Sequence, residues 1–277
     1  MQLDKTYIAV RERGFMEILD LSLHVVTRFA GPLALALLAG ILPLAIATHL
    51  LAADAGALEE DLAWNADYTA LVCVLAALAA PLAGAPATLL LGQSLFMERP
   101  SARRISRDLL SSLPQLIWFQ VVMRGALIFF VFTSFVPFVF QPYVGEIVLL
   151  ERNPLFQGRR RRHDSARQIT TMMRVRLLHK GSGGELFGRW ITSMAAGSIM
   201  AAMILLALTG CMQWISGNGE LDRTTYAIFV QIAVWVTVGF FTVVRFLSYL
   251  DLRIRREGWE VELKMRAEAT RLQGELV

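Results

Sequence analysis

Long apolar stretches that almost lack charged side chains dominate the pattern of this sequence. A helix needs roughly 20 apolar residues to cross about 30 Å of hydrocarbon. Four stretches satisfy this and predict membrane helices over 31–53, 69–96, 190–215 and 224–247. In the second, Pro81, Gly84 and Pro86 predict a kink or a break.

The stretch 111–150 predicts two further crossings. It contains 40 residues, about 60 Å as a helix at 1.5 Å per residue, twice what one crossing needs. Pro137 and Pro142 lie in its second half, and proline ends helices and disfavours helix at the preceding residue. We therefore expect a proline-broken hairpin with crossings at 112–134 and 137–151.

The distribution of charge favours an even number of crossings. Of the 27 Lys and Arg residues, 25 lie in the segments 1–30, 97–108, 151–190 and 245–277. Six crossings place all four segments on one side, as the positive-inside rule requires. The sequence thus predicts a multi-pass protein of the cell inner (plasma) membrane with both termini cytoplasmic.

Three segments outside the crossings have helical or basic patterns. Residues 1–30 predict an amphipathic helix, either lying in the headgroup plane or packed against the spans, although Ser22 interrupts its apolar stripe. A short hydroxyl can bond back to its own helix. Residues 152–189 form a basic cytoplasmic loop, and 250–277 predict a cytoplasmic helical tail with i, i+4 charge pairs.

Composition supports the class and limits the functions. Hydrophobic residues make up 55% of the 277 and charged residues 18%, against about 25% charged in soluble domains. The predicted fold is all-α, a polytopic membrane protein with six transmembrane helices. Nucleic-acid binding is not expected, because the basic residues adjoin membrane spans without a recognition motif.

Two ionisable residues fall within the predicted hairpin, Arg124 in its first arm and Glu146 in its second. Such residues are expensive in hydrocarbon and often functional. They predict a buried polar pair, which either forms a site in the bundle or fixes the hairpin register. An arginine that snorkels toward a wet cavity is the other interpretation.

A basic cluster in the cytoplasmic loop predicts a binding surface. Apolar residues interleave with its members, which favours a surface-lying helix that attracts anionic lipid headgroups or a partner protein. The cluster consists of Arg159, Arg160, Arg161, Arg162, Arg167, Arg174, Arg176 and Lys180.

No constellation for catalysis, metal or cofactor binding emerges, so we expect a protein that is not an enzyme and has no cofactor. Cys73 and Cys211 fall in apolar runs and predict small buried hydrophobes. His24 and His49 are isolated in sequence and predict histidines without partners. Glu151 and Asp251 predict interface anchors and helix-end charges.

Short motifs at 14–20, 146–152 and 249–263 resemble a broad group of bacterial six-helix membrane proteins. That group is related to the membrane domain attached to some glycerophosphodiester phosphodiesterases. The resemblance implies the six-helix fold but no enzymatic activity, since the phosphodiesterase barrel takes about 250 residues of its own. The chain departs from the group at 159–184, where four arginines and a Gly-Ser linker replace a small-residue stretch.

Two functions follow as expectations. The first is a non-catalytic scaffold or accessory subunit that acts through the basic loop and the tail. The alternative is a transporter or lipid-handling protein with a polar site in the helix bundle, because transporters often have broken helices at the midplane.

Overall fold

The computed structural model describes seven parts of the chain, and every element in them is a helix. The parts are 14–56, 64–95, 100–119, 143–151, 170–179, 183–217 and 222–257. The helices are α1 (Phe15–Arg28), α2 (Ala30–Gly56), α3 (Trp64–Ala83), α4 (Ala85–Ser94), α5 (Ala102–Ile117), α8 (Val144–Glu151), α9 (Thr171–His179), α10 (Gly183–Ser216) and α11 (Arg223–Glu257). The predicted all-α class is confirmed for these residues.

Four helical segments are long and apolar enough to cross a membrane. They are Ala30–Ala52, Ala66–Ser94, Gly183–Ser216 and Arg223–Arg256, and they coincide with the four crossings predicted at 31–53, 69–96, 190–215 and 224–247. Large apolar side chains such as Leu35 and Leu206 are about two-thirds exposed on their outer faces. A surface of this kind suits hydrocarbon and not water.

The predicted hairpin lies largely outside the described residues, which include neither 120–142 nor Arg124. The six-crossing count therefore stays a prediction. The helix that leads into its first arm, α5, begins at Ala102, ten residues before the predicted crossing. Ile105, Leu109 and Leu116 recur at helical spacing and pack against α4 and α8, so the basic segment before the hairpin is helical from Ala102 on.

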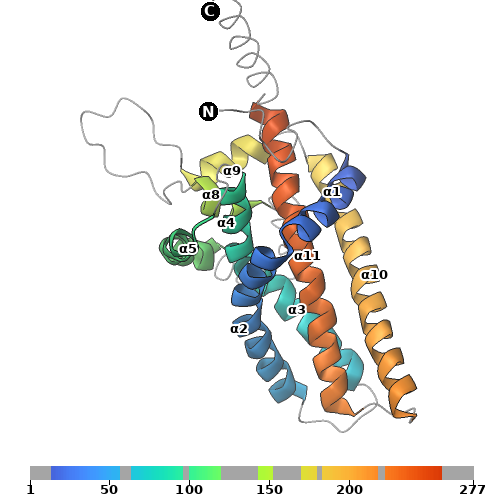
Figure 1. The fold of residues 1–277 in the computed structure, drawn as a ribbon. Coiled ribbons are helices and arrows are strands. Elements are labelled where there is room, and N and C mark those ends of the chain that lie inside the picture. The colour runs from blue at the N-terminus through green and yellow to red at the C-terminus, as the bar shows by residue number, and fades with distance from the viewer. Residues whose placement is uncertain are drawn as a thin grey trace, which may run out of the picture.

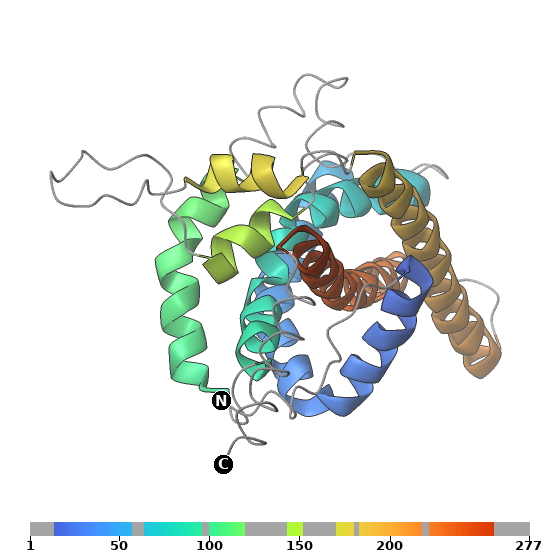
Figure 2. The same cartoon turned by 90° about the horizontal axis from the view of Figure 1, so that it is seen from above.

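Helix α11 is the central element of the bundle. Viewed from above, α1, α2, α3 and α10 lie around it (Figure 2), and Val243, Phe246 and Tyr249 are fully buried. The helix runs on to Glu257, so the predicted membrane helix and the start of the predicted helical tail form one continuous helix, while 258–277 lie outside the described residues. No glycine or proline occurs between Gly239 and Gly258, and without such a breaker the helix continues.

The predicted break in the second crossing is confirmed. α3 ends at Ala83 and α4 begins at Ala85, with Gly84 between them. A Cβ atom at Gly84 would lie 2.6 Å from Thr242 of α11, and a Cβ atom at Gly40 of α2 would lie 2.1 Å from the carbonyl oxygen of Ala83. These two glycines let the backbones of α2, α3 and α11 approach closely, as small residues do in membrane bundles.

Helix α1 packs against α11 and α2 (Figure 1). Ile18 and Val25 are buried in the same cluster as residues of α4 and α11. Ser22, also buried, donates a hydrogen bond of 2.7 Å to the carbonyl oxygen of Ile18, which confirms that the hydroxyl bonds back to its own helix. Of the two interpretations left open for this segment, the structure supports packing against the spans.

Candidate functional site

A cavity of about 350 Å³ lies between α3, α8, α10 and α11. Helices α10 and α11 run side by side in opposite directions (Figure 1). Along α10 the lining residues extend from Leu186 to Ala201, and along α11 from Val234 to Ser248. Each stretch corresponds to about 21–22 Å of helix at 1.5 Å per residue. The cavity is therefore long, comparable to two-thirds of a bilayer core.

The two ends of the cavity differ in polarity. On α10 the lining residues pass from Arg189 through Ser193 and Gly197 to Ala201. On α11 they pass from Arg245 through Phe241 to Val234, while the α3 wall consists largely of alanine. Because α10 and α11 are antiparallel, both arginines lie at the same end. The cavity thus has one charged end and one apolar end.

Glu146 and Arg245 form an ion pair in the charged end. Glu146 belongs to the short helix α8 and is 5% exposed. Its carboxylate oxygen lies 3.1 Å from Nη2 of Arg245 on α11, and both residues line the cavity. The predicted partner of Glu146, Arg124, lies outside the described residues, so that pairing is untested. The partner that the structure supplies is 99 residues away along the chain.

A second group of ion pairs joins α10 to α11 beside the same end. Nη2 of Arg189 lies 2.6 Å from Asp251 and 2.8 Å from Glu185. Arg255 lies 2.9 Å from each of the same two carboxylates. Asp251 was expected to be an interface anchor or a helix-end charge; it lies six residues before the end of α11 and is buried, 3% exposed.

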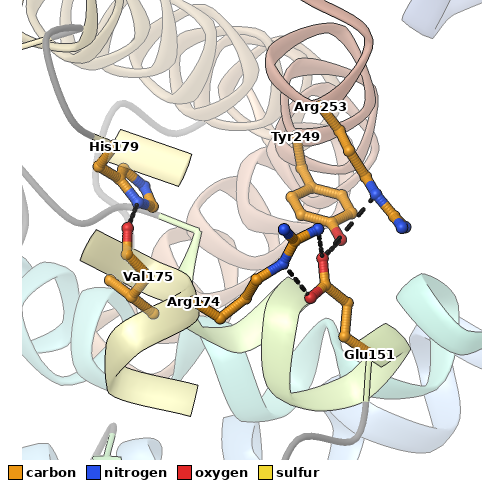
Figure 3. A network of polar contacts seen from close by, with 6 residues as sticks. All are labelled: Glu151, Arg174, Val175, His179, Tyr249 and Arg253. Atoms are coloured by element: carbon orange, nitrogen blue, oxygen red, sulfur yellow. Dashed lines mark hydrogen bonds and ion pairs between the residues drawn. The ribbon is translucent and has the colours of Figure 1, made fainter. Parts of the chain in front are cut away.

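Glu151, at the end of α8, is the centre of a third polar group (Figure 3). Arg174 of α9 donates two hydrogen bonds to its carboxylate, one of 3.0 Å to Oε1. The hydroxyl of Tyr249 donates to the same oxygen at 2.9 Å, and Nε of Arg253 lies 3.8 Å from it. Glu151 therefore makes polar contacts that join α8, α9 and α11, beside the apolar cluster of the same helices.

The predicted basic surface is described only in part. Arg159, Arg160, Arg161, Arg162, Arg167 and Lys180 lie outside the described residues. Arg174 points inward to Glu151 and its side chain is 18% exposed, whereas Arg176 on the same helix is exposed. Helix α9 also buries Val175 and Leu178, so it packs on the bundle with one face.

His179 was not singled out from the sequence, since no local motif marks it. It is 8% exposed, its Nδ1–H donates to the carbonyl oxygen of Val175 at 2.8 Å, and its ring stacks on Tyr143 at 5.8 Å between centroids. Among the described residues, Nε2 has no hydrogen-bond partner. Burial lowers the pKa of His179, although the bond to Val175 and the charge of Glu146 oppose the shift. The imidazole is thus held neutral in the fold.

A further polar network occupies the opposite half of the bundle. Nδ1 of His49 lies 2.8 Å from the hydroxyl of Tyr68. Gln231 donates to the same hydroxyl at 3.2 Å and accepts hydrogen bonds from Trp235 and Thr48. The prediction that His49 lacks a partner is wrong, because α2, α3 and α11 meet here. His24 also has a partner, the carbonyl oxygen of Asp20 at 3.0 Å.

The two cysteines are exposed on the bundle surface or toward the cavity. The prediction that they are buried hydrophobes is wrong, because an apolar helix in a membrane can turn such residues outward. Cys73 lines the cavity. Within the described parts of the chain, no group of three His, Cys, Asp or Glu side chains could hold a metal ion.

Comparisons with protein-family models, with curated proteins and with solved structures find no match for this chain.

Proposed function

We propose that this protein is a lipid-handling membrane protein that binds one amphipathic lipid in the cavity between α3, α8, α10 and α11. The observation that carries the proposal is the polarity of that cavity, with Arg189, Arg245 and Glu146 at one end and uncharged side chains, mostly alanine and valine, at the other. An acyl chain gains free energy in the apolar part, while a headgroup needs polar partners at the charged part. Binding sites that are mostly apolar with a few convergent polar groups are typical of small-molecule ligands.

The route of entry follows from the packing of α10. This helix packs mainly against α11, and its outer face exposes residues such as Ile199 and Met203. We expect the lipid to enter from the bilayer between α3 and α10. Under the predicted orientation, the charged end lies at the cytoplasmic leaflet, because Arg176, Arg253 and Arg256 are near it along the chain.

A photoreactive phospholipid with a diazirine near the end of its acyl chain tests the proposal in reconstituted membranes. Peptide mapping should find labelling of cavity residues such as Met194 and Ala77 that unlabelled lipid competes away. Labelling of Ile199 on the outer face should not saturate.

A G197L/A201L double variant fills the apolar part and should abolish the saturable fraction. A195L, at an exposed position of the same helix outside the cavity lining, should not. Labelling insensitive both to competitor and to G197L/A201L would refute the proposal.

Orientation can be tested separately with introduced cysteines in a variant whose Cys73 and Cys211 are alanine. Arg176 and Ser216 lie at opposite ends of the bundle, and both are exposed, so each can be replaced by cysteine in turn. An impermeant maleimide applied to intact cells should label Ser216→Cys and not Arg176→Cys. The reverse pattern would invert the predicted topology.

The scaffold function predicted from the sequence depends mainly on the arginine run at 159–162 and on 258–277. Both lie outside the described residues, and the function stays a prediction. The absence of enzymatic activity is likewise an expectation.

A further inference from the structure

The charged end of the cavity contains both signs of charge in contact. Arg189 comes from α10, Arg245 from α11 and Glu146 from α8, and all three line the cavity. The carboxylate of Glu146 is within 3.1 Å of the Arg245 guanidinium. A ligand at this end therefore meets a carboxylate as well as two arginines.

Among the described residues that line this end, Glu146 is 5% exposed and lies in contact with Arg245. Glu185, Asp251 and Arg255 pair with Arg189 or with one another outside the cavity lining. In a site of low dielectric, an added charge without a counter-charge is costly. A purely anionic headgroup would add a negative charge beside Glu146. A headgroup that carries both a phosphate and an ammonium group adds none.

An aromatic side chain also lies at the charged end. Trp190 follows Arg189 on α10 and lines the cavity. Tyr143, just before α8, lines it too, but it is 4% exposed and one face of its ring is covered by His179. Aromatic faces attract ammonium groups, and so does the carboxylate of Glu146. Guanidinium groups match the geometry of phosphate. The two halves of an amine-bearing headgroup thus each have partners of fitting chemistry.

We propose that the cavity selects a zwitterionic phospholipid with an ethanolamine-type headgroup, whose phosphate contacts Arg189 and Arg245 and whose ammonium contacts Glu146 and Trp190. This proposal rests on the lipid-binding function proposed above. It concerns the cavity alone and is separate from the predicted attraction of the basic loop for anionic headgroups.

Competition against the photoreactive lipid tests the selection. Unlabelled phosphatidylethanolamine should displace labelling of Met194 at about tenfold lower mole fraction than phosphatidylglycerol, the ratio expected for one cation–π or charge-assisted contact. Soluble glycerophosphoethanolamine should not compete, because it lacks the acyl chains that fill the apolar part. Competition by the soluble compound at the same concentration would show that a free headgroup is the ligand.

Variants identify the side chain that binds the ammonium group. Glu146→Gln keeps the size of the side chain and removes its charge, so the preference for phosphatidylethanolamine should fall to about onefold. Glu185→Gln is the matched control, because its carboxylate is also paired with an arginine but lies outside the cavity lining. It should keep the preference. The double variant E146Q/R245Q removes both charges of the pair and so leaves no unpaired arginine that could weaken the fold. It should also lose the preference.

The outcomes separate the two proposals. Saturable labelling with equal competition by both lipids would overturn the headgroup selection and leave the lipid-binding function standing. An unchanged preference in a folded E146Q/R245Q protein would also overturn the selection. Failure of every lipid to compete would refute the function itself.

Discussion

Asp251 of α11 places a carboxylate oxygen 2.6 Å from Nη2 of Arg189 of α10. Their side chains are 4% and 10% exposed. Because α10 packs mainly against α11 and buries little of its own surface, this buried pair helps to fix how far α10 is shifted along α11. It also holds Arg189 at the charged end of the cavity.

The Asp251→Asn variant tests this relationship. It leaves the Arg189 and Arg255 guanidiniums without their shared buried carboxylate, and breaking a buried pair on one side costs about 3–5 kcal/mol. Thermal unfolding of the purified protein in detergent should show a clearly lower melting temperature for this variant. Glu185→Gln, whose side chain is 44% exposed, should cost less than about 1 kcal/mol. Equal losses for the two variants would contradict a special role for Asp251.

Arg174 and Arg176 offer a matched comparison on one helix. Arg174→Gln removes the bidentate contact with Glu151, while Tyr249 still donates to that carboxylate. A lost charge-assisted hydrogen bond predicts destabilisation of about 1.5–3 kcal/mol. Arg176→Gln, at an exposed position, should leave the melting temperature within error. If Arg176→Gln destabilises the protein as much, α9 does not pack as described.

The burial of His179 predicts a dependence of stability on pH. Its pKa is lowered in the fold, mainly by burial, so the unfolded chain binds the proton more readily. The stabilising contribution is therefore complete above the unfolded pKa of about 6.5 and is lost as pH falls toward the folded pKa. The melting temperature of the wild type should fall relative to that of His179→Phe as pH falls from 7.5 to 5. The exposed His24, replaced by Phe, is the control, and a constant difference for His179→Phe would exclude the mechanism.

Close helix crossing at Gly40 predicts intolerance of any side chain there. A Cβ atom would lie 2.1 Å from the backbone oxygen of Ala83, and backbone cannot yield without moving α2 from α3. Gly40→Val should destabilise by about 1–3 kcal/mol or more. Gly31 lies on the same helix, at a position where a Cβ atom would meet nothing within 4 Å. Gly31→Val should therefore have only a small effect on yield and melting temperature. Similar behaviour of the two variants would contradict the crossing.

Local pattern predicted the elements whose formation depends on local chemistry. Hydrocarbon demands long apolar helices, so the runs at 31–53 and 190–215 were recognisable by length alone. Gly84 and its neighbouring prolines predicted the break between α3 and α4, and the hydroxyl of Ser22 bonds within its own helix as expected. Helix ends were less determined, since α11 passes through the predicted membrane boundary at 247.

The amino-acid sequence by itself therefore determined the all-helical class, the four helical segments that are long and apolar enough to cross a membrane, and the break in one of them. Only the tertiary structure decided which charges meet. Glu146 pairs with Arg245 and Arg189 pairs with Asp251. A cavity with one charged end forms between α3, α8, α10 and α11. The reason is physical: a helix such as α10, apolar on all sides, has no stripe that fixes its rotation about its axis. Its contacts with residues 62 positions away follow from how the helices pack together.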